Sequence, residues 1–535
     1  MKRSHRSQIL FRYGSRRITS TRAVHIPTAT ALLLLWLAMG AFPAWAQTGT
    51  PAAKPTLDPC TSGQEFATTD CTLTWHGITV YGAYDIGVGW VSHGLPENGY
   101  NYEGASLVNR NGYQHRFLVA PNNLQQTGIG IRGKEQFVPG WSVVFNASSG
   151  INPHSGLLAN ASKTDIINNG LPRSSYSYAI DGARAGQPFN DEIYGGISSE
   201  YFGTLTFGRE RSLGTDAMLQ YDPAGGSYAF SYIGYNGTMA GGGDTENSRW
   251  DDAVKYRITV GPVHFGAMYK FADGSGGCYS ATAGWTAATC TAESAHNNAY
   301  GFDLGATYGK FSADIVPQHY NQAISVLNPL LGPQSLTQPY QSTVNSINTN
   351  QIAGDNIVDP SETVYGIVTD NYGIIVAAKY AWDPIKFFAG YEYIWQNNPK
   401  NPLGVGASDQ GGYRMSGVED NNLDSQKLVN IWWAGAKCTY HSKTDITFSW
   451  YQQRQNTFRV PPTCVPGNFR ASCAGTLNEG SLYLDHHFTK RFDGFAGIAY
   501  SWVSGGLAIA IPHGPGVPYN SNNNFAPTIG GRFAF

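Results

Sequence analysis

The stretch FAPTIGGRFAF, residues 525–535, predicts a β-strand with two different faces. Phe525, Ile529, Phe533 and Phe535 share one parity, and small or polar residues hold the other. Because side chains alternate between the faces of a strand, one side is apolar and the other small or polar. A closed barrel pairs its last strand with its first, so a chain that ends inside a strand favours a barrel. The alternative for this segment alone is an edge strand of a soluble sandwich.

Segments with the same period of two recur from residue 73 to the end of the chain. We predict sixteen strands, over residues 73–90, 127–137, 141–150, 190–199, 202–210, 248–259, 262–272, 298–308, 310–320, 366–381, 384–397, 427–440, 443–455, 477–489, 492–504 and 525–535. Each is close to the roughly ten residues that a tilted membrane strand requires.

Short and long connections alternate between these strands. Long connections are predicted at 92–126, 151–189, 211–247, 273–297, 321–365, 398–426, 456–476 and 505–524, with tight turns between them. This layout is typical of outer-membrane barrels, whereas a soluble sandwich has mostly short links. We therefore predict an all-β fold, a sixteen-stranded antiparallel transmembrane β-barrel with short periplasmic turns and long outer loops.

The N-terminal residues predict export from the cytoplasm. Seven basic residues and no acidic ones precede the apolar run ALLLLWLAMGAF, which ends near Ala44-Trp45-Ala46. This pattern predicts a cleaved signal peptide over 1–46. We expect a periplasmic extension over 47–72 and the barrel over 73–535.

Composition and charge agree with this assignment. The chain has 64 Gly, 32 Tyr, 25 Phe and 13 Trp, a mixture suited to many strands and to rings at membrane interfaces. Of 35 basic residues, seven leave with the signal peptide, so 28 remain against 37 acidic ones and the net charge is −9. An acidic exported chain is a poor candidate for binding nucleic acid.

The seven cysteines suit an oxidising compartment. Three pairs lie close in sequence, and we predict the disulfides Cys60–Cys71, Cys278–Cys290 and Cys464–Cys473, with Cys438 left over. No CxxC occurs and no histidine stands at ligand spacing from a pair, so no metal and no cofactor are predicted.

Several motifs resemble those of Gram-negative general porins. Tyr81-Gly82 with Asp85 resembles the first strand of that family, and GIGIRGKEQF (128–137) resembles its second. FNDEIYGGISSEYFGTLTFGRER (189–211) resembles its fourth and fifth strands. The resemblance implies an outer-membrane homotrimer in contact with lipid and lipopolysaccharide. It also implies that the assembly machinery reads Phe535 and that the third long loop, 211–247, folds inward and narrows the pore.

Strand parity identifies the residues expected to face the water in the barrel. We predict a basic wall from Arg132, Lys134, Lys255, Arg257 and Arg532, opposed by Asp216 and Asp222 of the third long loop. The expected function is passive diffusion of ions and small hydrophilic solutes, with a weak preference for small anions.

Three other functions remain open at this point. A track of Tyr81, Tyr451 and Tyr483 suggests a channel specific for sugars or organic anions, and a plugged barrel would be purely structural. For an enzyme, Asp485, His486 and His487 form the best cluster, but no GxSxG motif accompanies them. We predict that the chain is not an enzyme.

Overall fold

The computed structural model describes residues 59–92, 115–151, 153, 156, 188–235, 249–271, 279–280, 284–285, 298–321, 325–326, 366–367, 370–397, 424–458, 473–505 and 523–535. The chain divides into two units, Met1–Thr56 and Leu57–Phe535, and every described residue belongs to the second. The predicted signal peptide therefore lies outside the described residues. Among those residues, none of the helices has the length and apolar character needed to cross a membrane.

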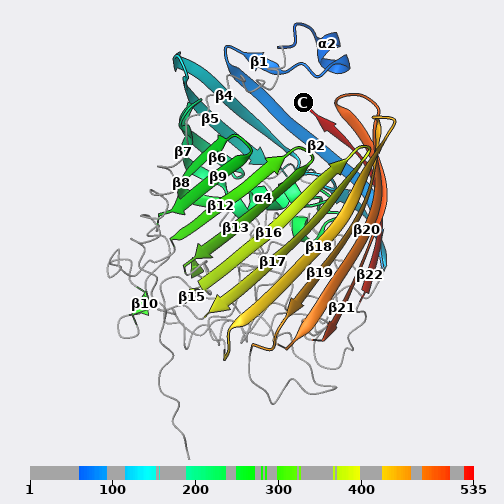
Figure 1. Cartoon of the computed structure of the whole chain (residues 1–535). Helices are drawn as coiled ribbons and strands as arrows, with labels where there is room; N and C mark the ends of the chain where they lie inside the picture. Colours follow the sequence, from blue (N-terminus) through cyan, green and yellow to red (C-terminus); the bar gives the residue numbers. More distant parts are fainter. Residues whose placement is uncertain are drawn as a thin grey trace, which may run out of the picture. The chain divides into compact units, whose positions relative to one another are not determined.

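The second unit is built from long antiparallel strands that wind around a common interior (Figure 1). These strands are β2 (Ile78–Val91), β3 (Arg116–Pro121), β4 (Gly128–Val138), β5 (Trp141–Gly150), β6 (Glu192–Ser199), β7 (Gly203–Arg211), β8 (Arg249–Val260), β9 (Val263–Lys270), β12 (Ala299–Tyr308), β13 (Phe311–Tyr320), β16 (Asp370–Trp382), β17 (Ile385–Asn397), β18 (Lys427–Tyr440), β19 (Thr444–Gln455), β20 (Gly475–His487), β21 (Phe492–Gly505) and β22 (Asn523–Ala534). Strand β22 pairs with β2, so Phe533 lies opposite Tyr84 and the sheet closes. The closed antiparallel barrel confirms the predicted fold class.

The barrel has sixteen strand positions, although the described sheet contains eighteen strands. One extra strand, β1 (Leu73–Trp75), is only a short hairpin arm on β2. The other arises because β3 and β4 share one position, β4 beside the first half of β2 and β3 beside its second half.

Predicted boundaries differ from the structure in several places, and two of the differences have clear local reasons. The predicted strand 73–90 is broken by a tight turn at His76-Gly77, where both residues have positive φ. The predicted loop 92–126 contains β3, and residues 122–127 leave the ladder before β4 begins. Asp85 of β2 holds this excursion, because its carboxylate accepts the backbone N–H groups of Leu124 at 2.7 Å and Asn123 at 3.0 Å.

The two faces of the strands differ as their parity predicts. On the outer face, Tyr84, Val88 and Ile529 are 47%, 55% and 58% exposed. On the inner face of the same strand β2, Asp85 is fully buried. An apolar outer surface is what a barrel presents to lipid, and polar side chains on the inside are typical of a channel.

The connection after β7 folds into the barrel instead of away from it. It contains α4 (Leu213–Tyr221), whose N-cap Ser212 accepts the Thr215 N–H, and the short helix α5 (Tyr232–Tyr235). Leu213 and Tyr221 of α4 are fully buried, and the helix packs against β9, β12, β13, β16 and β17. Figure 1 shows α4 among these strands.

The short elements lie at the ends of the barrel or in its connections. They are α2 (Gly63–Thr68), β10 (Tyr279–Ser280), β11 (Gly284–Trp285), β14 (Ser325–Val326) and β15 (Gly366–Ile367). The segment around α2 is closed by the Cys60–Cys71 disulfide, which confirms that predicted pair. Arg491 fixes this segment to the barrel, since its guanidinium lies 4.0 Å from the Phe66 ring centroid and donates to the Cys71 carbonyl.

The other predicted disulfides lie wholly or partly outside the described residues. Cys278, Cys290 and Cys464 are not described. Cys473 is disulfide-bonded, and Cys438 is a free thiol.

Candidate channel constriction

The inward loop, residues 212–235, crosses the interior and is tied to the wall behind it. The Tyr221 hydroxyl donates to Asp314 of β13 at 2.7 Å, and Trp433 of β18 donates its indole N–H to the Tyr221 carbonyl at 3.0 Å. Tyr451 of β19 donates its hydroxyl to Asp222 at 2.5 Å. Buried hydrogen bonds of this kind give the loop one defined position.

The far end of the loop is tied to two other parts of the barrel. Ser481 of β20 donates to the Phe230 carbonyl at 2.6 Å, and the Phe230 ring stacks on Tyr483 with centroids 4.5 Å apart. Ser227 donates to the carbonyl of Asn123, in the excursion held by Asp85, at 2.5 Å. The loop therefore spans the interior from β13 to the excursion between β3 and β4.

One end of α4 carries an acid that meets two bases of the wall. Asp216 Oδ2 lies 2.7 Å from Lys255 Nζ and also contacts Arg257, both on β8. Burial raises the pKa of Asp216, but Lys255, Arg257 and Arg211 outweigh it and hold that pKa below its ordinary value of 3.8. Three of the predicted constriction residues are thus brought together.

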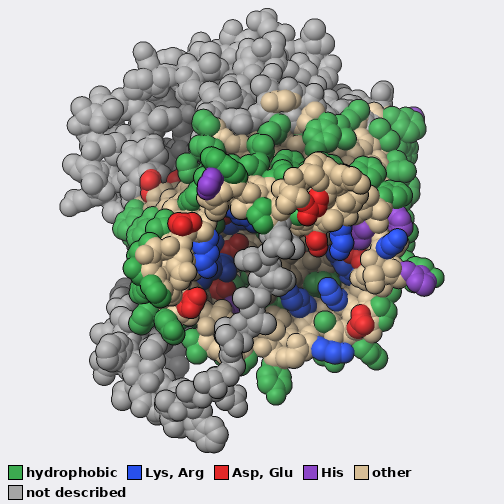
Figure 2. All heavy atoms as spheres, turned by 90° about the horizontal axis from the view of Figure 1, so that it is seen from above, with side chains coloured by type: hydrophobic (Ala, Val, Ile, Leu, Met, Phe, Trp, Pro, Cys, Tyr) green, Lys and Arg blue, Asp and Glu red, His purple; other side chains and the backbone are tan. Residues whose placement is uncertain are grey.

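A second group of charges continues from this cluster along β6, β7 and β8. Arg249 contacts Asp191, and Arg211 lies 3.2 Å from the same carboxylate. Arg209 donates to Asp251 at 2.6 Å. Seen from one end of the barrel, basic and acidic side chains gather around the hollowed middle and apolar ones lie at the outer rim (Figure 2).

A cavity of about 320 Å³ lies between the inward loop and the wall formed by β2, β4 and β5. Its polar lining includes Tyr81, Gln125, Gln126, Ser148, Asp191, Arg211, Tyr228 and Arg249, and Leu219 and Gly226 of the loop close it on the other side. Of the three charged residues in the described part of its lining, two are basic. The cavity is therefore polar, with a positive balance of charge.

The remaining predicted residues occupy different environments. Arg132 is exposed, with its guanidinium 4.9 Å from the centroid of the Tyr81 ring that lines the cavity, and Lys134 is also exposed on β4. Arg532 is neutralised by two acids, since it donates to Asp493 at 3.0 Å and to Asp485 at 3.3 Å.

Asp222 is buried rather than on the water side. It is 2% exposed, and its carboxylate accepts the Tyr451 hydroxyl and the Gly226 N–H. Burial raises the pKa of this carboxyl. Its position at the C-terminus of α4 makes it an anchor of the loop.

Two residues of the predicted aromatic track are also covered by the loop. Tyr451 is fully buried and Tyr483 is 5% exposed, and neither belongs to the cavity lining. Tyr81 lines the cavity, together with Tyr228 of the loop, which is not one of the three residues of the predicted track.

Sequence reasoning missed Arg211 and Asp191. By parity, Arg209 shares a face with Leu205 and Phe207, so it reaches the lumen only if the strand is interrupted before it. The strand is interrupted there, because the register between β7 and β8 shifts between Gly208 and Glu210. Gly208 has a φ of 140°, and this conformation turns the chain so that Arg209 is 5% exposed. Gly208 stands just before the charged residues that end β7, and this glycine is the sequence signal that could have indicated the shift in register.

The candidate catalytic cluster belongs to a network of ion pairs. His487 Nδ1 lies 2.7 Å from Asp493 Oδ1, and Arg532 bridges Asp493 and Asp485. His486 points to the other face of the strand from His487, and its Nδ1 is hydrogen-bonded to the Thr444 hydroxyl at 2.8 Å. These contacts leave the histidines in structural roles.

Comparison with known proteins identifies the class that this barrel and its inward loop define. A family model described as Gram-negative porin matches residues 29–505, and the chain belongs to this family. Since the family consists of channel proteins, the prediction that the chain is not an enzyme is confirmed.

The chain is also similar to individual porins. It is 24% identical over 196 residues to an outer membrane porin protein of Bordetella pertussis, a match that covers 36% of this chain and 42% of that protein. The chain thus spans less than half the length of this curated relative. Membership of the Gram-negative porin family confirms an outer-membrane location.

A solved structure supports the fold. The anion-selective porin from Comamonas acidovorans superimposes with a TM-score of 0.52 at 13% identity, covering 86% of this chain and 99% of that one. At this identity the likeness concerns the fold alone.

Proposed function

We propose that the chain forms a water-filled outer-membrane channel for passive diffusion of ions and small hydrophilic solutes. The observation that carries this proposal is the polar cavity of about 320 Å³ between the inward loop and the wall of β2, β4 and β5. In a plugged structural barrel, side chains would fill this space.

We further propose a weak preference for small anions. Arg211 and Arg249 face the cavity against Asp191, and Arg132 stands next to its Tyr81. Charges at a narrow passage act on an ion at close range, whereas loop charges are screened within about 8 Å at physiological salt. The passage should therefore outweigh the acidic net charge of the chain.

A second candidate function is a channel specific for a sugar or an organic anion. It is favoured by Tyr81 and Tyr228, two aromatic rings beside arginines in the same cavity. Aromatic faces pack on apolar sugar faces, and guanidinium groups bind carboxylates in a fixed geometry.

The assembly of the chain is proposed from its resemblance to porins. We propose a homotrimer, contact with lipid and lipopolysaccharide, and recognition of Phe535 by the outer-membrane assembly machinery. Cleavage of the signal peptide 1–46 and a periplasmic extension over 47–72 belong to the same proposal.

Single-channel recording in planar bilayers tests the function. A general porin gives steps that grow linearly with voltage, and a specific channel gives smaller steps that a bound sugar or organic anion blocks. Absence of channels from correctly folded protein would refute both candidates.

A matched pair of variants tests whether the cavity is the passage. Leu219→Trp adds bulk to the cavity lining and should lower the conductance. Leu482→Trp adds the same bulk on the outer face, where Leu482 is 48% exposed, and should leave the conductance unchanged.

A further inference from the structure

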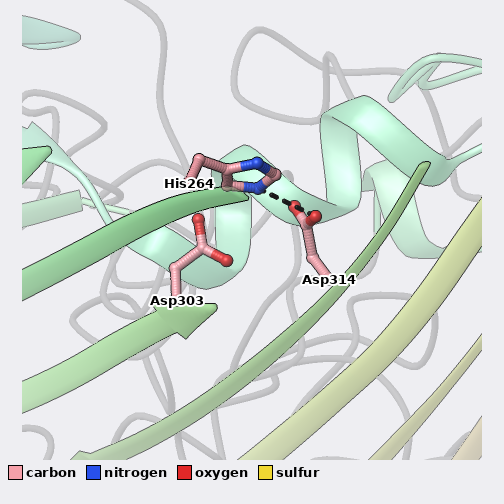
Figure 3. Close-up of side chains that lie close together, drawn as sticks. All are labelled: His264, Asp303 and Asp314. Carbon is pink, nitrogen blue, oxygen red and sulfur yellow. Dashed lines mark ion pairs between the residues drawn. The ribbon is translucent and has the colours of Figure 1, made fainter. Parts of the chain in front are cut away.

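Three metal-ligand side chains converge on the inner wall beneath α4. His264 lies on β9, Asp303 on β12 and Asp314 on β13, which are neighbours in the sheet. One nitrogen or oxygen from each lies within 4.8 Å of the other two, and His264 Nε2 is 2.9 Å from Asp314 Oδ1. Figure 3 shows the three side chains pointing toward one another.

The carboxylates of Asp303 and Asp314 are buried, and the positive charge in contact with them is too small to neutralise both. Both Asp303 and Asp314 are 5% exposed, and Asp303 Oδ1 has no hydrogen-bond partner among the residues that the structure describes. Within the described part of the chain, neither carboxylate forms an ion pair with a lysine or arginine, and Arg257 and Lys379 act on them only from further away. One imidazolium could neutralise only one of them, and a buried unpaired carboxylate is costly. A further cation would remove that cost.

Glycine keeps the space between the ligands open. Gly305 lies opposite both His264 and Asp314 in the ladder. A Cβ on Gly305 would overlap Asp314 Oδ1 and His264 Nε2, so any side chain here would close the site. Gly266 stands opposite Asp303, and a Cβ there would lie 3.2 Å from the Asp303 Cβ and crowd it less severely.

We propose that His264, Asp303 and Asp314 bind a divalent transition metal, with Zn²⁺ as the best match. One imidazole nitrogen and two carboxylate oxygens are ligands that zinc accepts, and they leave a position for water. Calcium and magnesium prefer oxygen ligands alone, so the histidine disfavours them. A doubly charged ion neutralises both carboxylates.

The inward loop supplies an outer contact to this site. The Tyr221 hydroxyl donates to Asp314 Oδ1 at 2.7 Å, and such bonds orient a metal-binding carboxylate. The bound ion would thus join β9, β12 and β13 and, through Tyr221, the end of α4.

A second cluster in the barrel provides an internal control. Asp485, His487 and Asp493 have the same composition and similar spacing. Here, however, Arg532 pairs with both carboxylates, so their charge is already balanced. We therefore expect the metal at His264 and not at His487.

The test titrates the folded full chain with Co²⁺, a spectroscopic substitute for Zn²⁺, and then measures Zn²⁺ binding by calorimetry. The wild type should bind one metal ion per chain and show the visible absorption of Co²⁺ bound by nitrogen and oxygen ligands. His264→Gln and Asp303→Asn should each weaken binding roughly tenfold or more. His487→Gln should bind like the wild type.

Folding of every variant is checked by heat-modifiable migration on gels, and Gly305→Ala is a second way to close the site. No metal binding by the folded wild type would overturn the proposal. The proposal would also be overturned if His487→Gln lost metal binding while His264→Gln retained it.

Discussion

Asp216 of α4 and Lys255 of β8 form an ion pair, with Oδ2 and Nζ 2.7 Å apart, that joins the inward loop to the barrel wall. Lys255 is 7% exposed and Asp216 29%, so the pair lies partly covered inside the barrel. Arg257 contacts the same oxygen. Asp216 therefore neutralises part of the positive charge of Lys255 and Arg257 beside the proposed passage.

Removing this acid should increase the preference for anions. In Asp216→Asn, Lys255 and Arg257 lose their shared counter-charge, while Tyr221 and Tyr451 still hold the loop. The reversal potential, measured in a salt gradient, should move toward the equilibrium potential of the anion. Asp70→Asn is the control, because Asp70 is 60% exposed outside the barrel wall and 3.9 Å from Lys490. An equal shift in both variants would contradict a local effect.

Acidification is a second test of the same prediction and should reproduce the effect of Asp216→Asn only at low pH. The neighbouring bases hold the pKa of Asp216 below 3.8, so the carboxylate stays charged until the pH falls below this value. The stability that the charged carboxylate gives to the folded protein is complete above the pKa that Asp216 has in the unfolded chain. It is lost as the pH falls through the lower pKa that Asp216 has in the folded protein. A shift of the reversal potential already at about pH 5, above the ordinary range of an aspartate, would point to another group.

Loss of Arg132 and Lys134 should move the selectivity toward cations. Arg132 lies over Tyr81 of the cavity lining, and its charge should attract anions to the passage. Reversal potentials of Arg132→Gln and Lys134→Gln, measured separately, would show which of them contributes. Lys310→Gln, in an exposed turn, is the charge-matched control. If neither variant differs from this control, the two side chains do not line the constriction.

Tyr451→Phe should loosen the inward loop. The substitution removes one hydrogen bond from the buried Asp222 carboxylate and should cost about 1–3 kcal/mol of unfolding free energy. Channel recordings should show larger current fluctuations. Tyr84→Phe, on the outer face where Tyr84 is 47% exposed, should change neither quantity. Equal stability of the two variants would mean that the Tyr451–Asp222 bond contributes nothing.

Much of the barrel could be predicted because strand parity is a local property. Strands β5 and β18 have the predicted boundaries, 141–150 and 427–440. The break at 122–127 could not be predicted, because it depends on Asp85 binding three backbone groups from another segment.

The site was harder to predict because its contacts are distant in sequence. Asp222 appeared to be a water-facing loop acid, but its partner Tyr451 is 229 residues away. His264, Asp303 and Asp314 come from three strands with no motif spacing, and only the ladder brings them together. In the first case the fold of the inward loop decides which side chains meet, and in the second the pairing register of the strands does.

The Cys60–Cys71 disulfide should stiffen the segment around α2 without holding the barrel together. Its cysteines are 11 residues apart, and a bridge over so short a loop contributes roughly 2–3 kcal/mol. In Cys60→Ser with Cys71→Ser, proteolysis near α2 should accelerate while the barrel remains resistant. Mass spectrometry of unreduced peptides tests the predicted Cys278–Cys290 and Cys464–Cys473 pairs in the same protein. Unfolding of the whole barrel in the double variant would contradict this limited role.

Phe535 should contribute to assembly through its ring as well as its backbone. Its N–H donates to the Gly82 carbonyl at 3.0 Å and its carbonyl accepts the Gly82 N–H at 2.9 Å, so it extends the closure between β22 and β2. Deleting Phe535 removes both bonds and the ring, and unassembled protein should accumulate in the periplasm. Phe535→Ala keeps the backbone bonds and removes only the ring. If the assembly machinery reads the ring, Phe535→Ala should fail to insert in cells yet refold in detergent like the wild type. Normal insertion of Phe535→Ala would show that the backbone pairing alone is required.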